Sequence, residues 1–222
     1  MKIGFIGIGN MGLPMALNLL KAGHDVATFD LSDGALQAAE NAGARVGSSA
    51  RDVAQDRDFI VTMLPAGKQV LEVYKGKDGV LTGASEQTIF VDCSTIDVKT
   101  AREVANEVRR QGWEMLDAPV SGGVAGAESG TLTFMVGGDE VIVSQARPLF
   151  EVMGRKVIHA GDSGNGQAAK TCNNMLLGIS MIGISESFTL GKMLGLDPEI
   201  LFSIISSASG DCWALRNHLP VP

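Results

Sequence analysis

A glycine pattern near the amino terminus constrains the fold of this chain more than any other feature. The segment Gly7-Ile8-Gly9-Asn10-Met11-Gly12 has G-x-G-x-x-G spacing, follows a strand-like apolar run and precedes a helical pattern. Gly7 permits a tight turn, Gly9 allows the backbone to approach a pyrophosphate, and Gly12 lets the helix lie close to the strand. The segment therefore predicts a strand, a turn and a helix whose amino end binds a dinucleotide phosphate. The alternative is a glycine-rich turn without a cofactor.

An acidic residue extends this prediction. Asp30 follows the second predicted strand, Asp25–Phe29, 18 residues after Gly12, with no Arg or Lys beside it. A carboxylate here accepts hydrogen bonds from ribose hydroxyls and repels a 2′-phosphate, so we expect NAD rather than NADP. Residues after two further strands complete the expected set. The candidate cofactor-binding residues are Gly7, Gly9, Asn10, Met11, Gly12, Asp30, Met63, Leu64, Pro65 and Thr95. For Thr95, lining the nicotinamide and capping the next helix are equally favoured.

Short apolar runs alternate with helical patterns through the first three quarters of the chain. The predicted strands are Lys2–Ile8, Asp25–Phe29, Phe59–Leu64, Thr88–Asp92, Glu114–Leu116, a late strand around Leu132–Val136, and Lys156–His159. The predicted helices are Met11–Ala22, Leu36–Asn41, Val98–Gln111 and Asp139–Met153. This rhythm is typical of an α/β domain with a mostly parallel, Rossmann-type sheet covered by helices on both faces.

The pattern changes after residue 163. The segment Gly166–Leu194 predicts one long helix that contains Gly178, Gly183 and Gly191, for which close packing against another element is the expected compensation. A second helix is expected from the N-cap Asp197 to about Ser207. We expect a dinucleotide-binding domain over 1–163 and the start of a helical substrate or dimerisation domain over 164–222. The long helix has more apolar surface than one short helix can cover, which predicts that this domain is incomplete or completed by another chain.

Composition and charge exclude several classes of protein. The 222 residues are 45% hydrophobic and 19% charged, as in a globular chain, and the net charge of −7 argues against nucleic acid as a partner. The apolar runs Ile3–Leu20 and Met175–Ile184 have the features of neither a targeting segment nor a membrane span. The cytoplasm is expected, or an organelle matrix after processing. Three widely spaced cysteines favour buried thiols over a metal site or a disulfide framework.

Two segments are candidates for substrate chemistry. Ser121, Gly122 and Gly123 follow a predicted strand, and backbone amides freed by glycines suit a carboxylate; an ordinary flexible loop is equally compatible with the composition. Lys170 lies near the start of the long helix among small and apolar neighbours, and Asn174 shares its face. A partly desolvated lysine without an acidic neighbour should have a lowered pKa, which suits proton transfer. The alternative is a surface lysine with a packed stem.

Several motifs occur together in one order along nearly the whole chain. They are GIGNMG, MLPAG, DCSTID, DAPVSGG, GTLTFMVGG and GNGQAAKTCNNMLLG. In them the chain resembles the 3-hydroxyisobutyrate dehydrogenase branch of the β-hydroxyacid dehydrogenases. The resemblance implies NAD-dependent oxidation of a small 3-hydroxy carboxylic acid in valine catabolism, by a homodimer or homotetramer. It implies that Lys170 is the catalytic acid/base and that Asn174 positions it. It also implies that Ser121, Gly122 and Gly123 hold the substrate carboxylate, with Thr95 near both ligands.

The resemblance leaves two alternatives. Tartronate semialdehyde and succinic semialdehyde reductases share the fold and the lysine, but MLPAG, DCSTI and CNNMLLG favour 3-hydroxyisobutyrate. A non-catalytic NAD-binding module is a rival from another class, and the presence of Lys170 and Asn174 argues against it. Relatives continue past the position of Pro222 with further helices that complete the second domain.

Overall fold

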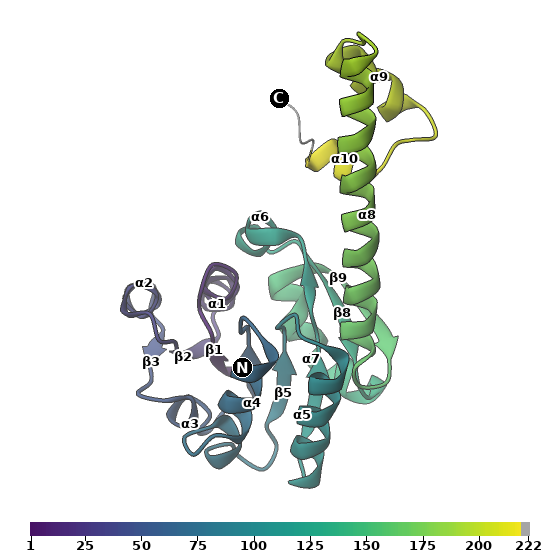
Figure 1. Ribbon diagram of the computed structural model, residues 1–222. Coiled ribbons are helices and arrows are strands. Elements are labelled where there is room, and N and C mark those ends of the chain that lie inside the picture. The colour runs from purple at the N-terminus through teal and green to yellow at the C-terminus, as the bar shows by residue number, and fades with distance from the viewer. Residues whose placement is uncertain (219–222) are drawn as a thin grey trace. The chain divides into compact units, whose positions relative to one another are not determined.

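The computed structural model describes residues 1–218 and divides into two compact units, Met1–Lys170 and the residues from Thr171 onward (Figure 1). The strands are β1 (Lys2–Ile6), β2 (Asp25–Phe29), β3 (Arg45–Val46), β4 (Phe59–Thr62), β5 (Ile89–Asp92), β6 (Glu114–Asp117), β7 (Val120–Ser121), β8 (Leu132–Gly137) and β9 (Gly154–Gly161). The helices are α1 (Gly12–Lys21), α2 (Asp33–Asn41), α3 (Ala50–Val53), α4 (Gly67–Lys75), the 3-10 helix η1 (Val80–Thr82), α5 (Val98–Arg110), α6 (Gly123–Glu128), α7 (Glu140–Met153), α8 (Asn165–Met193), α9 (Pro198–Ser207) and α10 (Trp213–Asn217).

The first unit is built on one sheet with the strand order β3-β2-β1-β4-β5-β6-β8-β7, and β9 also pairs with β8. The strands from β3 to β6 are parallel, whereas β8 runs antiparallel to β6 and β7. The sheet is mostly parallel, as predicted. The order reverses at β1, which lies between β2 and β4, and ligands of such sheets bind beyond the carboxyl ends of the strands at this point. The glycine-rich turn follows β1.

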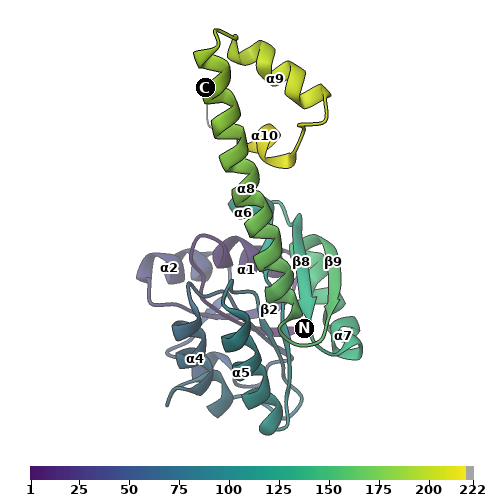
Figure 2. The same cartoon turned by 45° about the vertical axis from the view of Figure 1, so that its right-hand side comes forward.

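Helices cover both faces of the sheet (Figure 2), and their buried side chains form two apolar layers. Buried side chains of α1, α2, α6 and α7 form one layer, and those of α3, α4 and α5 form the other. The strands between them are nearly continuous apolar runs because both of their faces are buried. The late strand β8 has the predicted alternation, since Leu132, Phe134 and Val136 are fully buried while Thr133 and Met135 are only half-buried.

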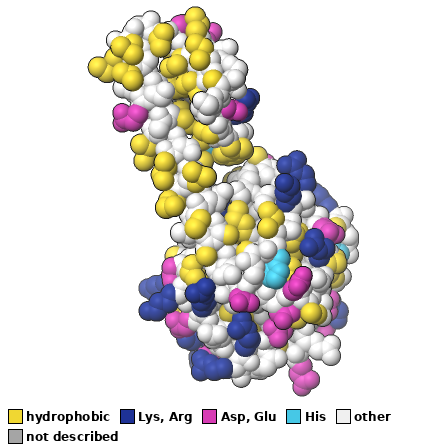
Figure 3. All heavy atoms as spheres, turned by 90° about the vertical axis from the view of Figure 1, so that its right-hand side faces the viewer, with side chains coloured by type: hydrophobic (Ala, Val, Ile, Leu, Met, Phe, Trp, Pro, Cys, Tyr) yellow, Lys and Arg dark blue, Asp and Glu magenta, His cyan; other side chains and the backbone are white. Residues whose placement is uncertain are grey.

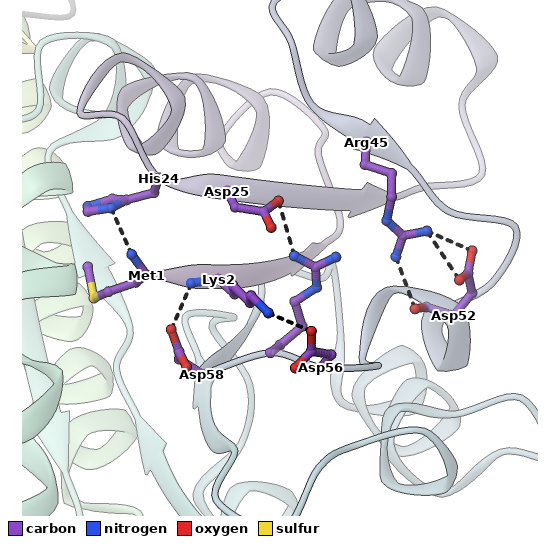
Figure 4. Close-up of polar contacts among 9 residues, drawn as sticks. Met1, Lys2, His24, Asp25, Arg45, Asp52, Asp56 and Asp58 are labelled. Atoms are coloured by element: carbon purple, nitrogen blue, oxygen red, sulfur yellow. Dashed lines mark hydrogen bonds and ion pairs between the residues drawn. The ribbon is translucent and has the colours of Figure 1, made fainter.

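Charged side chains join the strands at the amino-terminal edge of the sheet (Figure 4). The Lys2 amide donates to Asp58, the Lys2 ammonium donates to Asp56 at 2.6 Å, and Arg57 pairs with Asp25 at 3.2 Å. These contacts lie at the opposite edge from the glycine-rich turn. We therefore assign them a structural role.

The second unit has a small core of its own. Ile184 and Phe188 of α8 pack against Ala214 and Leu215 of α10. Many other apolar side chains of this unit are exposed, and Figure 3 shows those on one face as yellow atoms. The more exposed ones include Met175, Leu176, Ile179, Ile182, Leu190, Met193, Leu194, Ile200, Ile204 and Trp213. The expectation that the long helix carries more apolar surface than α9 covers is therefore confirmed for the described residues.

Several local predictions need correction. Strand β1 ends at Ile6 instead of Ile8, because Gly7 adopts a φ of +88° and begins the turn. Helices α3, α4 and α6 were not predicted from the sequence, because they are short or begin without a side-chain cap. Among the three glycines for which close packing was predicted, Gly191 is closely packed, since a Cβ there would lie 2.5 Å from Leu201. The close packing expected at Gly178 and Gly183 is absent within the described residues.

The expectation of buried cysteines is only partly right. Cys93 is buried at the end of β5, whereas Cys212 is half-buried and Cys172 is exposed on α8. Among the described residues, no His, Cys, Asp and Glu side chains cluster in a way that could hold a metal ion. None of the helices within residues 1–218 has the length and apolar character needed to cross a bilayer.

Candidate functional site

The three glycines of the turn after β1 have three different surroundings. A Cβ on Gly7 would lie 2.3 Å from the Met63 carbonyl oxygen, and one on Gly12 would lie 1.9 Å from the Gly7 carbonyl oxygen. Neither position has room for a side chain. A Cβ on Gly9 would meet no atom within 4 Å. Gly7 and Gly12 therefore allow the turn and the helix to pack, while Gly9 leaves its backbone open to an incoming group.

Asp30 is joined directly to this turn. Its Oδ2 accepts a hydrogen bond from the Ile8 amide at 2.7 Å, and its Oδ1 accepts one from the Ser32 amide at 2.9 Å. Each carboxylate oxygen can accept more than one hydrogen bond, so the half-buried carboxylate has acceptor capacity left for a ligand. Asp30 thus orders the turn as well as presenting charge at the end of β2.

A cavity of about 1030 Å³ opens beside the turn and the ends of β2 and β4. Its lining includes Gly7, Gly9, Asn10, Met11, Gly12, Asp30, Met63, Leu64 and Pro65. This is the whole predicted cofactor set apart from Thr95. The volume is at the upper end of the range for small-molecule and cofactor sites. With an open Gly9, a helix amino terminus and an acid at the strand end, these residues fit a dinucleotide.

The segment after β5 presents one hydroxyl to solvent. Thr95 is exposed between Ser94 and Ile96, which are both buried. The N-cap of α5 is Asp97, whose Oδ1 accepts a hydrogen bond from the Thr100 amide at 2.9 Å. Capping by Thr95 was one of two alternatives, and it is wrong because Asp97 performs that role. Thr95 therefore remains available at the carboxyl edge of the sheet.

The segment expected to bind the substrate carboxylate lies in regular structure and is not an irregular loop. Ser121 ends β7, and Gly123 begins α6. Gly122 and Gly123 have φ values of +139° and +62°, a region that favours glycine. The side chain of Asn18 on α1 donates to the Ala127 carbonyl at 2.7 Å and so ties α6 to the helix that follows the glycine-rich turn. Both glycines are exposed.

Lys170 is the last residue of the first unit and lies in the second turn of α8. Its side chain is half-buried, and this burial lowers the pKa of the ammonium group, as expected from the sequence. No ion pair or hydrogen bond holds the ammonium group among the residues that the structure describes. Asn174 lies one helical turn later, in the second unit, where its side chain is exposed and its Oδ1 accepts a hydrogen bond from Asn173.

Two residues that the sequence analysis missed fix the start of α8. The buried Asp117 carboxylate, at the end of β6, accepts hydrogen bonds from the Gly164 amide at 2.6 Å and the Gln167 amide at 2.9 Å. Burial raises the pKa of Asp117, and these amide hydrogen bonds oppose the rise. The Gln167 side chain forms hydrogen bonds with the backbone of Ser94 and Ile96, on either side of Thr95. No local sequence signal identifies these partners, because the fold brings them together over 47 to 73 residues.

A second buried acid lies under the ends of β4 and β5. Asp92 Oδ1 accepts hydrogen bonds from Thr62 Oγ1 at 2.8 Å and from Ser94 Oγ at 2.5 Å, whereas Oδ2 is buried without a partner in the described structure. Burial raises the pKa of Asp92, and the hydroxyl hydrogen bonds oppose this. Ser94 Oγ also accepts a hydrogen bond from the Leu64 amide. The acid thus orders the strand ends that border the cavity.

Asp92→Asn is expected to change how stability depends on pH. An acid whose pKa is raised by folding stabilises the fold below its unfolded-state pKa, and this contribution is lost as pH rises through the folded pKa. Asparagine keeps the Oδ1 contacts and cannot ionise. The free energy of unfolding of the variant minus that of the parent should therefore increase with pH above about pH 4, by about 1.4 kcal/mol for each unit of pKa shift. Urea unfolding from pH 4 to 9 measures this difference.

The matched control is Asp56→Asn. Asp56 is exposed, pairs with Lys2, and has a lowered pKa because of that hydrogen bond. Its contribution to stability is present above its unfolded-state pKa and lost as pH falls. At neutral pH the free energy of unfolding of Asp56→Asn should therefore be lower than that of the parent. Parallel pH profiles of stability for Asp92→Asn and the parent would show that folding does not raise the pKa of Asp92.

Comparison with known proteins adds family information to this geometry. Residues 2–161 match a family described as the NAD binding domain of 6-phosphogluconate dehydrogenase, and residues 164–222 match one described as NAD-binding of NADP-dependent 3-hydroxyisobutyrate dehydrogenase. A 3-hydroxyisobutyrate dehydrogenase of Pseudomonas aeruginosa is 49% identical over 99% of this chain and 74% of its own length. An NAD-dependent L-serine dehydrogenase of the same bacterium is 49% identical over 100% of this chain and 74% of its own length.

A solved structure matches at the same level. It is Mycobacterium tuberculosis 3-hydroxyisobutyrate dehydrogenase with L-serine, at a TM-score of 0.95 and 48% identity, covering 100% of this chain and 75% of that chain. The probable mitochondrial 3-hydroxyisobutyrate dehydrogenase of Dictyostelium discoideum is 47% identical over 99% of this chain and 68% of its own length.

Proposed function

Because this chain belongs to the 3-hydroxyisobutyrate dehydrogenase family, whose members are NAD-dependent oxidoreductases acting on CH–OH groups, we propose that it oxidises 3-hydroxyisobutyrate to methylmalonate semialdehyde. The observation that carries the proposal is the half-buried Lys170. Its lowered pKa and its anchored position on α8 suit a group that exchanges a proton with the substrate hydroxyl.

The glycine-rich turn and Asp30 hold the cofactor in this proposal. The amides around Gly9 and the amino terminus of α1 bind the pyrophosphate, and Asp30 accepts hydrogen bonds from the adenosine ribose. NAD⁺, when bound, supplies the hydride acceptor. Met63, Leu64 and Pro65, with Thr95 at the neighbouring strand end, border the nicotinamide side of the site.

Lys170 performs the proton chemistry in this proposal. During oxidation the neutral amine accepts the proton of the hydroxyl group as the carbon–oxygen bond becomes a carbonyl, and the hydrogen on that carbon leaves as hydride. In the reverse direction the protonated amine returns the proton to the carbonyl oxygen. Burial without an acidic partner favours the neutral amine, which oxidation requires.

The substrate carboxylate is proposed to lie against Ser121, Gly122 and Gly123. The hydroxyl and the unblocked amides of this segment suit an anion, which the net charge of −7 would otherwise repel. Asn174, one turn after Lys170, is proposed to orient the lysine and the substrate, as family membership suggests.

L-Serine is a second candidate substrate, because one relative is named for it and one similar structure contains it. Both molecules are 3-hydroxy carboxylates that differ at carbon 2, which carries a methyl group in one and an ammonium group in the other. Formation of NADH at 340 nm with 3-hydroxyisobutyrate, L-serine and glycerate tests the proposal. The largest kcat/KM should be seen with 3-hydroxyisobutyrate. A larger value for L-serine would reassign the substrate, and the absence of NADH with all three would reject the function.

The Asp30 side chain offers a test of cofactor choice. Asp30→Ser removes the charge that repels a 2′-phosphate, so the ratio of kcat/KM for NAD to that for NADP should fall by about tenfold or more. Asp33→Ser, which removes an exposed charge from the first turn of α2, is the control and should leave the ratio unchanged. An unaltered ratio in Asp30→Ser would mean that the carboxylate orders only the turn.

A further inference from the structure

The Gln167 side chain bridges two parts of the proposed site. It is fully buried, its Nε2 donates a hydrogen bond to the Ser94 carbonyl at 2.6 Å, and its Oε1 accepts one from the Ile96 amide at 3.2 Å. These two backbone groups flank Thr95. One amide side chain of α8 therefore fixes the segment that presents the Thr95 hydroxyl.

Gln167 lies three residues before Lys170 on the same helix. Residues three apart lie close together on a helix surface, so the side chain that holds the Thr95 segment and the proposed proton acceptor share one rigid turn. A displacement of the 94–96 segment relative to α8 would change the spacing between Thr95 and Lys170. The two hydrogen bonds of Gln167 resist that displacement.

Other contacts already hold the amino-terminal end of α8 in place without the Gln167 side chain. Asp117 already accepts the amides of Gly164 and Gln167. Backbone packing also holds this turn, since a Cβ on Gly166 would lie 2.4 Å from the Met135 carbonyl oxygen. A buried amide brings a desolvation cost that an apolar side chain of the same length avoids, and only its hydrogen bonds offset that cost.

We propose that Gln167 is a positioning residue, which holds the Thr95 segment against the first turns of α8 so that Thr95 and Lys170 meet the reacting alcohol at a fixed separation. This inference rests on the proposed function. It assigns Gln167 no contact with substrate or cofactor. It concerns the alignment of the proton acceptor during the chemical step.

The test compares Gln167→Met and Gln167→Glu with Thr88→Val. Methionine has a similar length and makes neither hydrogen bond, whereas ionised glutamate keeps the oxygen that accepts from Ile96 and loses the donor to Ser94. Thr88 is also buried, and its hydroxyl donates to the Arg57 carbonyl at 2.8 Å, but it precedes β5 at the edge of the sheet opposite Thr95. The control therefore loses a buried hydrogen bond away from the site.

Both Gln167 variants should lower kcat by about 10- to 100-fold, because a small misplacement of reacting groups has effects of this size. The dissociation constant of NAD should stay within about twofold of the parent value, as expected when only the chemical step is affected. Amide hydrogen exchange at Ile96 should become faster in Gln167→Met. Thr88→Val should lower the unfolding midpoint while kcat and Ile96 exchange stay at the parent values.

A double-mutant cycle separates positioning from general stability. In a Lys170→Ala background, Gln167→Met should lower kcat by less than about twofold, because residues that act as a unit are not additive. An equal fold-loss in both backgrounds, or an unchanged kcat in Gln167→Met, would overturn the positioning role. If the parent chain has no turnover, the proposed function fails, and the positioning role fails with it. If Gln167→Met does not fold, Gln167→Glu carries the same comparison.

Discussion

Lys170→Ala is expected to lower the turnover of 3-hydroxyisobutyrate by about 10²- to 10⁴-fold, the usual contribution of a positioned general base. The affinity for NAD should not change, because the residues proposed to hold the nucleotide, the glycine-rich turn and Asp30, lie on other elements of the first unit. Stopped-flow formation of NADH measures the loss of turnover, and fluorescence titration with NADH measures the affinity.

Lys156→Ala is the matched control for this result. Lys156 is an exposed lysine of β9, and its replacement removes one positive charge from the first unit. Its turnover should equal that of the parent. If Lys170→Ala were as active as Lys156→Ala, the assignment of the proton acceptor would be withdrawn and the site reduced to a nucleotide-binding one.

The second large effect is a contrast between two glycines of one turn. Gly12→Ala would place a Cβ 1.9 Å from the Gly7 carbonyl oxygen, so the helix must move away from the strand. We expect the free energy of unfolding to fall by about 3 kcal/mol, and NAD binding to be lost with the turn geometry. In Gly9→Ala the new Cβ meets no protein atom within 4 Å. That variant should fold normally and bind NAD about tenfold or more weakly, a difference of about 1.4 kcal/mol in binding free energy.

Gly34→Ala is the control for both variants. Its Cβ also meets nothing within 4 Å, and Gly34 lies in α2, where alanine is the better helix former. Its stability should equal or slightly exceed that of the parent, with unaltered NAD affinity. Normal NAD binding by Gly9→Ala would mean that the phosphate does not approach Gly9, and full stability of Gly12→Ala would contradict the tight packing of the turn.

Local chemistry explains which parts of the site could be predicted from the sequence. The glycine-rich turn, Asp30 and the residues after β4 each directly follow a predicted strand, so the local sequence identifies them. They lie together around one cavity. The long helix was also predictable, since an uninterrupted helical pattern follows Gly166.

Other parts depend on contacts between distant segments. In the sequence, Asp117 is only the first residue of a loop motif. In the structure its carboxylate accepts hydrogen bonds from the amides of Gly164 and Gln167, which lie 47 and 50 positions later. The sequence predicts Gln167 only as a polar residue of a helix, whereas in the structure it is fully buried against Ser94 and Ile96. Neither role has a local pattern. Short elements such as α6 were missed for a related reason, because tertiary contacts such as that of Asn18 help to hold them.

The pH dependence of kcat/KM for oxidation of 3-hydroxyisobutyrate by NAD tests the central claim most directly. The account predicts that the logarithm of kcat/KM rises by one for each pH unit as a single group loses its proton. The midpoint of this rise should lie below the ordinary lysine pKa of about 10.5. The same limb should be absent from the residual activity of Lys170→Ala. A rising limb that persists unchanged in Lys170→Ala would contradict the account, because the proton would then be accepted by another group.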